Sequence, residues 1–166
     1  MNVPPECWLT GKAVPRPSPI QGLGLFATAP IVAGAVVMRL GGTVIDGAAL
    51  RRLEPPYSSV TLDDDAHLLI DPAHPVRYGN HGCDPNLWHL DAVTIAARRD
   101  IAEGEELLID YATHTLASWW SMACACASPL CRGTISGDDW RIDRLRSAYG
   151  RHWTPALVRR IEAEGG

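Results

Sequence analysis

The chain has 166 residues, of which 46% are hydrophobic and 20% are charged, and its formal net charge is −4. This composition excludes a disordered chain and predicts one globular domain with a core of its own. The acidic balance argues against a protein that binds nucleic acid directly through phosphate contacts, and it suits a basic partner.

Two further exclusions concern membranes and disulfides. No apolar run approaches the ~20 residues that a bilayer-spanning helix needs, so we expect no membrane segment. Pro4 and Pro5 stand where a secretory leader would be basic and then apolar, which predicts a cytoplasmic protein. The five cysteines are an odd number, which fits poorly with a disulfide framework.

The N-terminal third predicts short strands separated by prolines and glycines. Residues 1–19 contain five prolines and predict an extended arm with at most a short strand near Trp8. Asp46 is expected to cap a helix over 47–53, which the following two prolines end. The strands expected in this third span residues 22–27, where a glycine loop comes first, 35–40 and 43–45.

The rest of the chain predicts further strands and then helices. Residues 115–122 predict a helix that leads into three cysteines. Two more helices are expected over 138–149 and 154–163, the first capped by aspartates and the second opened by a Thr-Pro pair. Strands are expected over 67–70, 92–97 and 107–111, with a strand or loop over 57–62. Many short strands with helices gathered at the C-terminus indicate a β-rich α+β fold.

Residues 80–86, with the sequence Asn-His-Gly-Cys-Asp-Pro-Asn, predict a tight, polar, non-helical segment. Pro85 biases Asp84 away from the helical region, and Asp and Asn tolerate the dihedral angles of turns. An ordinary surface turn would explain these residues. It gives no reason for His81 and Cys83 beside them.

The cysteines carry the strongest chemical signal. Cys124, Cys126 and Cys131 form a C-x-C-x4-C cluster that lacks a fourth thiolate, which Cys83 can supply. Four thiolates in a tetrahedron make a closed, structural type of zinc site. Buried free thiols are the plainer alternative, and a free thiol is the expected role of the remaining cysteine, Cys7.

Together these segments resemble the SET-domain protein-lysine methyltransferases. The resemblance covers about residues 20–133 and implies a SET β-fold in which the chain threads through a pseudoknot, with a post-SET zinc site and C-terminal helices. The matching motifs are the G-x-G loop over 22–24, N-H-x-C-x-P-N over 80–86, E-L-x-x-D-Y over 106–111 and C-x-C-x4-C-x-G over 124–133.

The resemblance also implies the binding residues. Those expected to bind S-adenosylmethionine are Gly22, Leu23, Gly24, Asn80, His81 and Tyr111. Those expected to hold one structural zinc ion are Cys83, Cys124, Cys126 and Cys131. The candidate walls of the substrate channel are Tyr57, Trp88 and Ile109, although an ordinary core role is as good an interpretation of Tyr57 and Trp88.

Tyr111 is the expected catalytic residue. A half-buried sheet tyrosine is its ordinary interpretation. In the family, a fixed phenolic oxygen orients a neutral lysine amine, whose free pKa is about 10.4, toward the methyl group. The position two residues earlier helps to set how many methyl groups are added. Here it is Ile109, which is smaller than an aromatic residue and has no hydroxyl group to hold a water molecule, so we expect products beyond the monomethyl state.

The chain departs from the family pattern in two motifs. Gly82 stands where the family usually has serine, and residues 39–42 lack the tyrosine of its E-Y-x-G-E strand. The run from Asp63 to Asp65 is interpreted first as a solvated turn and second as a docking patch for a basic substrate. We divide the chain into an N-terminal arm (1–19), a SET domain (20–113), a post-SET zinc-binding segment (114–135) and a helical tail (136–166).

The function expected from this resemblance is a protein-lysine N-methyltransferase that uses S-adenosylmethionine. Its partner would be a basic protein or a lysine-containing peptide. Two alternatives remain. One is a non-catalytic SET module that binds or scaffolds other proteins, and the other is a small zinc-binding interaction domain whose remaining motif matches are accidental.

Overall fold

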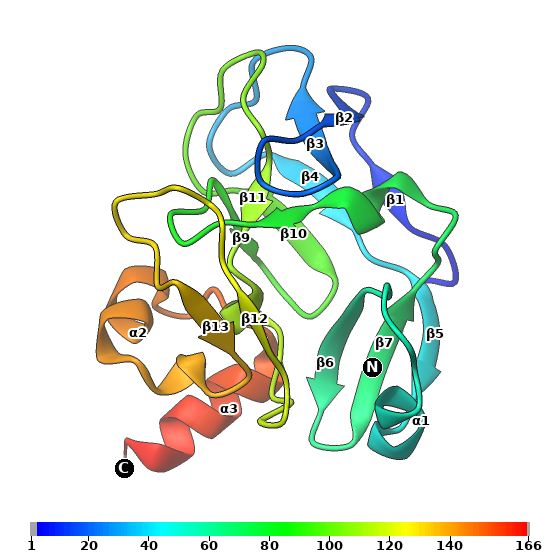
Figure 1. Ribbon diagram of the computed structural model, residues 1–166, viewed down its shortest axis with the longest axis vertical. Coiled ribbons are helices and arrows are strands. Elements are labelled where there is room, and N and C mark those ends of the chain that lie inside the picture. The colour runs from blue at the N-terminus through cyan, green and yellow to red at the C-terminus, as the bar shows by residue number, and fades with distance from the viewer. Residues whose placement is uncertain (1–2, 166) are drawn as a thin grey trace.

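A computed structural model describes residues 3–165, and five small sheets organise them. The largest is antiparallel with the strand order β1–β4–β10–β9 (Figure 1). Its core-facing side chains, such as Val37 and Ile95, are buried in the main apolar cluster. The four strands are β1 (Trp8–Leu9), β4 (Val36–Arg39), β10 (Thr94–Ala97) and β9 (Leu87–His89).

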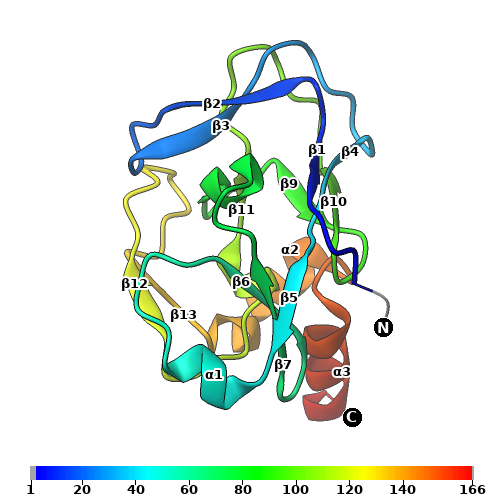
Figure 2. The same ribbon diagram turned by 90° about the vertical axis from the view of Figure 1, so that its right-hand side faces the viewer.

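Two other antiparallel sheets lie at opposite ends of the molecule (Figures 1 and 2). At one end is the hairpin of β2 (Ala13–Pro17) and β3 (Leu23–Ala27). At the other end is the sheet of β5 (Gly42–Ile45), β7 (Ala66–Ile70) and β6 (Ser59–Asp63), beside helix α1 (Gly47–Arg51).

The N-terminal arm contains more structure than its prolines predicted. Pro15 and Pro17 lie within β2, where they pair with Leu25 and Leu23. This is possible because β2 is an edge strand and alternate residues of an edge strand need not donate to a neighbour. Asp46 caps α1 as expected, accepting a 2.6 Å hydrogen bond from the Ala49 amide.

The fourth sheet is a short parallel pair, β8 (Asn80–His81) beside β11 (Leu108–Ile109). It brings the N-H-x-C-x-P-N and E-L-x-x-D-Y motifs side by side, as the expected pseudoknot fold requires. The 3-10 helices η1 (Pro75–Tyr78) and η2 (Tyr111–Thr113) flank the pair. Tyr111 therefore begins a 3-10 turn directly after the strand.

The predicted helix over 115–122 is wrong. Instead, β12 (Ser121–Ala123) pairs with β13 (Thr134–Ser136) as the fifth sheet. Backbone groups of this segment are committed elsewhere, because the Leu116 amide donates to Thr61 Oγ1 and the Trp120 carbonyl accepts from the Gly137 amide. These contacts compete with the hydrogen bonds of a helix.

The C-terminal tail packs on a second apolar cluster. The helix expected over 138–149 is divided into the 3-10 turn η3 (Asp139–Arg141) and α2 (Asp143–Tyr149), because Ile142 is extended. Helix α3 (Pro155–Glu164) follows Thr154, whose side chain makes no capping bond. The cluster consists of Ala112, Trp140, Leu145, Tyr149, Trp153 and Leu157. No helix among residues 3–165 is long and apolar enough to cross a bilayer.

Candidate active site and metal centre

Asn80 joins three of the predicted motif segments. Its amide group lies 3.2 Å from the Gln21 carbonyl oxygen, 3.1 Å from that of Leu23 and 2.9 Å from Glu106 Oε1. The glycine loop, the β8 segment and the strand that leads to Tyr111 therefore meet at one side chain.

Gly24 is required by the close approach of Glu106. A Cβ atom at position 24 would overlap the Glu106 carboxylate, which also accepts a 3.0 Å hydrogen bond from the Ser18 hydroxyl. Gly22 adopts φ of +51°, in the left-handed region that favours glycine. The two positions of the G-x-G loop therefore favour glycine for different reasons, the backbone conformation at Gly22 and the lack of space for a side chain at Gly24.

His81 connects Tyr111 to the cysteine cluster. The Tyr111 backbone N–H lies 3.2 Å from His81 Nδ1, and His81 Nε2 lies 3.2 Å from Cys83 Sγ. Burial lowers the pKa of His81 to about 4, so the ring is neutral near pH 7. Since Nδ1 accepts from the amide, the single ring proton is on Nε2, facing the sulfur.

Tyr111 has its hydroxyl group fixed by the main chain. It donates a 2.8 Å hydrogen bond to the Gly79 carbonyl oxygen, just before β8. Burial, with a smaller contribution from the Glu106 charge, raises the pKa of Tyr111 to about 12. The residue is therefore a neutral phenol near pH 7 whose oxygen lone pairs remain able to accept.

The four cysteines expected to bind zinc come together. Their sulfur atoms all lie within 4.8 Å of one another, and the Cys83 and Cys124 sulfurs are 3.8 Å apart. A tetrahedral ion with Zn–S bonds of about 2.3 Å places its sulfur ligands about 3.8 Å apart. The cluster, completed by Cys126 and Cys131, therefore fits one zinc ion. Cys7 stands apart, with its thiol 3.1 Å from the Gly41 carbonyl oxygen.

Sequence reasoning missed the residue that joins this cluster to the segment that carries Tyr111. Arg132 donates two hydrogen bonds to the Asp110 carboxylate, at 2.7 and 2.8 Å, and a third to Asp139 at 2.9 Å. Tyr149 also donates to Asp110, at 2.8 Å. Burial alone would raise the pKa of Asp110, but Arg132 brings it below its usual value. The position of Arg132 directly after Cys131 was the only signal in the sequence.

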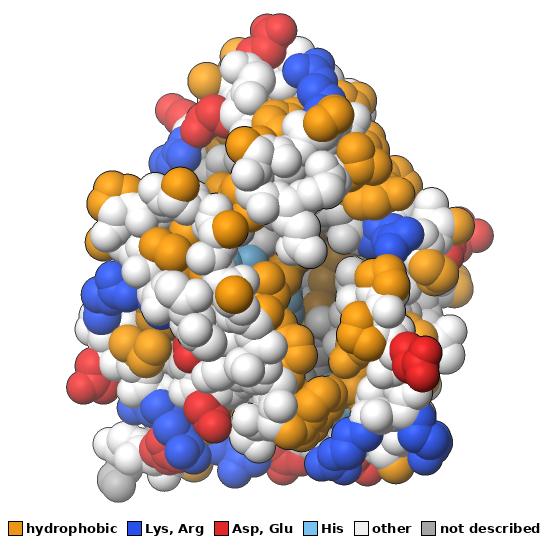
Figure 3. Space-filling view, in the orientation of Figure 1, with side chains coloured by type: hydrophobic (Ala, Val, Ile, Leu, Met, Phe, Trp, Pro, Cys, Tyr) orange, Lys and Arg blue, Asp and Glu red, His pale blue; other side chains and the backbone are white. Residues whose placement is uncertain are grey.

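An apolar pocket of about 140 Å³ opens beside Tyr111. The hollow is visible on the face shown in Figure 3, with hydrophobic side chains along its walls and histidine in its depth. Tyr57 and Ile109, two candidate walls of the substrate channel, line this pocket. His67, His114, Trp119 and Trp120 also line the pocket, and the sequence analysis did not place them there.

The expectation that Trp88 forms a wall of the substrate channel is corrected, because Trp88 is not among the residues that line this pocket. Its ring stacks on His152, with the two ring centres 3.4 Å apart and an interplanar angle of 6°. The Arg98 guanidinium lies over the same indole, 5.9 Å from its centre. Trp88 therefore packs against the C-terminal tail.

In the acidic run from Asp63 to Asp65, two carboxylates form ion pairs with arginines of the tail. Asp63 lies 2.6 Å from an Arg159 nitrogen, and Asp64 lies 3.5 Å from one of Arg160. The docking interpretation of this run loses support, because α3 already supplies its basic partners.

A comparison with family models identifies the chain. The model described as "SET domain" matches residues 22–112. The chain belongs to the SET-domain family. This membership overturns the alternative of a zinc-binding interaction domain with accidental motif matches.

Named relatives of this SET-domain chain are histone-lysine N-methyltransferases. The chain is 29% identical to ash1 of Drosophila melanogaster over 143 aligned residues. The alignment covers 75% of the chain and 6% of that relative. The chain is 33% identical over 132 residues to trr of the same organism, covering 69% of the chain and 5% of that relative. The chain thus spans a small part of the length of these relatives.

Solved structures support the SET fold. The methyltransferase domain of the human histone-lysine N-methyltransferase SETMAR superposes with a TM-score of 0.61 at 20% identity. The match covers 75% of the chain and 58% of that structure. At this level of identity the likeness is evidence of the fold alone.

Proposed function

We propose that this SET-domain chain is an S-adenosylmethionine-dependent protein-lysine N-methyltransferase. The observation that carries the proposal is the place of Tyr111. Its backbone is bonded to His81 of the segment that holds the glycine loop, and its ring lines the apolar pocket on the other side. A residue so placed can contact both a cofactor and a lysine side chain.

The cofactor site is proposed from the meeting of the motif segments. Its members would be Gly22, Leu23, Gly24, Asn80, His81 and Tyr111. When bound, S-adenosylmethionine would supply a sulfonium methyl group, which the amine nitrogen takes as the S–C bond breaks and a neutral thioether leaves. Leu23 is 40% exposed, so its apolar side chain is free to cover part of a bound molecule.

The lysine would enter through the apolar pocket. Transfer into such surroundings disfavours the ammonium form of an amine whose free pKa is about 10.4, and so favours the nucleophilic neutral form. Because the Tyr111 proton is donated to the Gly79 carbonyl oxygen, the phenolic oxygen is left to accept an amine N–H. Tyr111 therefore orients the amine and does not serve as its base.

The zinc ion is proposed as a structural element. It would be held by Cys83, Cys124, Cys126 and Cys131, and four thiolates leave no open position for a substrate. The ion would fix the post-SET segment against His81, since Cys83 is bonded to that ring. A basic protein is the proposed substrate class, in keeping with relatives that are named as histone-lysine methyltransferases.

The test is turnover on core histones with radiolabelled S-adenosylmethionine, comparing the wild type with Tyr111→Phe. The Phe variant should bind the cofactor with nearly unchanged affinity, as measured by calorimetry, while kcat falls by roughly 100-fold or more. Equal turnover in both would remove Tyr111 from the mechanism. Cofactor binding without turnover on any basic protein would favour the alternative of a non-catalytic SET module.

A further inference from the structure

Two histidines that the proposed mechanism does not use form a pair behind the pocket. His89 is completely buried in β9, with its Nδ1 3.1 Å from the Asp91 carbonyl oxygen. Its other ring nitrogen, Nε2, lies 3.3 Å from Nδ1 of His114. His114 follows η2 and lines the pocket next to Tyr111.

The carbonyl oxygen fixes the protons of both rings. A carbonyl oxygen can only accept, so His89 Nδ1 carries the proton and donates to Asp91. In a neutral ring, His89 Nε2 is then an acceptor, and the proton between the rings belongs to His114 Nδ1. It follows that Nε2 of a neutral His114 carries no proton and is an acceptor too.

Both rings are neutral under ordinary conditions. Burial lowers the pKa of His89 to about 4 and that of His114 to about 3. The Asp110 carboxylate favours protonation of His114, but it is neutralised by its two hydrogen bonds from Arg132.

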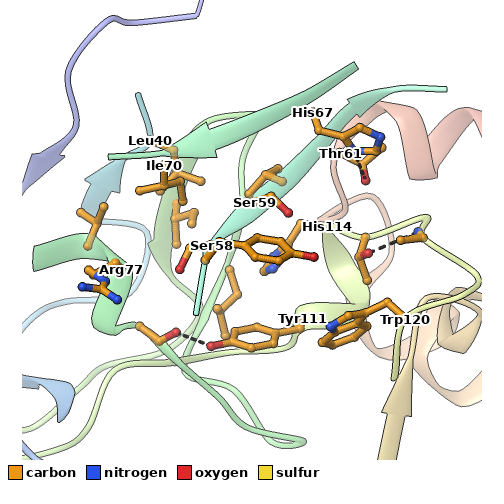
Figure 4. A pocket seen from close by; sticks show the side chains of 18 of the residues that line it. Leu40, Ser58, Ser59, Thr61, His67, Ile70, Arg77, Tyr111, His114 and Trp120 are labelled. Atoms are coloured by element: carbon orange, nitrogen blue, oxygen red, sulfur yellow. Dashed lines mark hydrogen bonds between the residues drawn. The ribbon is translucent and has the colours of Figure 1, made fainter. Parts of the chain in front are cut away.

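The free nitrogen of His114 belongs to the pocket rather than to the core. The two nitrogens of an imidazole point to nearly opposite sides, so Nε2 is directed away from the buried His89. Among residues 3–165 it has no hydrogen-bond partner. The His114 and Tyr111 ring centres are 5.3 Å apart, and Figure 4 shows both rings within the pocket, with the Tyr111 hydroxyl bonded to the main chain.

We propose that His114 Nε2 is a second acceptor for the N–H groups of the substrate amine, held in the accepting tautomer by His89. This inference rests on the proposed function and assigns a specificity-determining residue to the same site. A neutral lysine amine has two N–H bonds and one lone pair. If Tyr111 accepts one N–H and His114 the other, the direction of the lone pair is set.

In this arrangement the contribution of His114 to kcat/KM depends on the methylation state of the substrate lysine. An unmodified neutral amine can satisfy both acceptors, a monomethyl amine only one, and a dimethyl amine neither. His114→Phe removes the acceptor while keeping a ring of similar size. It should lower kcat/KM for an unmodified lysine roughly tenfold and leave that for dimethyl-lysine within about twofold, because only the former loses a hydrogen bond.

The kinetic test compares two peptides that differ only at one lysine, unmodified or dimethylated, taken from whichever histone sequence the wild type methylates. His67→Phe is the matched control, since His67 also lines the pocket and bonds Thr61 behind it. His67→Phe should change kcat/KM for both peptides by the same factor. His114→Gln, which retains an acceptor, should recover part of the preference. An equal loss on both peptides in His114→Phe would overturn the proposal.

A second readout needs no turnover. In 15N spectra of the full chain, His114 Nε2 should appear unprotonated, and it should shift on titration with butylammonium but not with butyltrimethylammonium, which has no N–H. In His89→Phe the tautomer should no longer be fixed. If histones are not methylated but this shift is seen, the proposed function fails while the acceptor stands. A protonated Nε2, or no selective shift, would refute the acceptor itself.

Discussion

At the scale of single residues, the site depends on groups whose ordinary chemistry is constrained by the main chain. Tyr111 is a phenol whose proton is committed to the Gly79 carbonyl oxygen, and His81 is a neutral ring whose Nδ1 is committed to the Tyr111 amide. Neither group is available as a base near pH 7, because burial shifts the pKa of each away from that range. The proposed site would therefore position reactants more than it would move protons.

Ile109 carries the prediction on how many methyl groups are added. Its apolar side chain lines the pocket and leaves space beside Tyr111. The wild type should therefore form products beyond the monomethyl state, because the amine can turn after the first transfer. Ile109→Tyr adds a hydroxyl group that can hold a water molecule, and it should shift the product toward monomethyl-lysine.

Intact-mass analysis of a methylated substrate under excess cofactor measures both outcomes. Ile109→Phe is the matched control, because it adds the ring without the hydroxyl group. A wild-type product that stops at one methyl group, unchanged in Ile109→Tyr, would mean that Ile109 does not control the count.

At the scale of elements, the loop between β12 and β13 holds three of the four clustered cysteines. Cys124 and Cys126 directly follow β12, and Cys131 lies in the loop that leads to β13. The two strands are short, and the remaining cysteine of the cluster, Cys83, belongs to the segment after β8. A metal ion would therefore add a second link, beside Arg132, between this element and the proposed cofactor site.

Removal of one thiolate tests this link. We expect one zinc ion per chain in the purified wild type, and Cys131→Ser should lose both the ion and most of the affinity for S-adenosylmethionine. Metal analysis by plasma mass spectrometry and calorimetry provide the two measurements. Cys7→Ser, which alters the thiol outside the cluster, should retain both. Stoichiometric cofactor binding by a metal-free chain would contradict the idea that zinc builds the pocket wall.

At the scale of the whole molecule, Arg132 fastens the tail to the body of the fold. Its guanidinium group bridges Asp110, next to Tyr111, and Asp139 at the start of the tail. Tyr149 of α2 reaches the same Asp110 carboxylate. The apolar cluster formed around Trp153 packs this tail on η2, so the tail supports the 3-10 turn that begins at Tyr111.

Arg132→Met should therefore destabilise the protein by about 3–5 kcal/mol, because it leaves the completely buried Asp110 carboxylate without its charged partner. Chemical denaturation measures the change in the free energy of unfolding. Arg141→Met is the matched control, since the Arg141–Glu164 pair is exposed and such pairs are worth about 0–1 kcal/mol. Similar small losses in both variants would show that Arg132 is not a structural bridge.

The sequence alone determined those features whose signal is local. Residues 80–86 and the C-x-C-x4-C spacing specify their chemistry within a few positions, and short apolar runs such as 67–70 form strands close to where they were expected. Asp46 began its helix as predicted, because an N-cap depends only on residues within one turn. The family match over 22–112 rests on the same local patterns.

Tertiary structure decided the features that depend on distant partners. Residues 115–122 formed no helix because Thr61 and Gly137 compete for their backbone groups. Trp88 does not line the pocket, because its ring stacks on His152, 64 positions later in the chain. The Arg132–Asp110 bridge and the His89–His114 pair join residues 22 and 25 positions apart. No periodicity or spacing reports such contacts, since each exists only after the chain has brought its partners together and removed them from water.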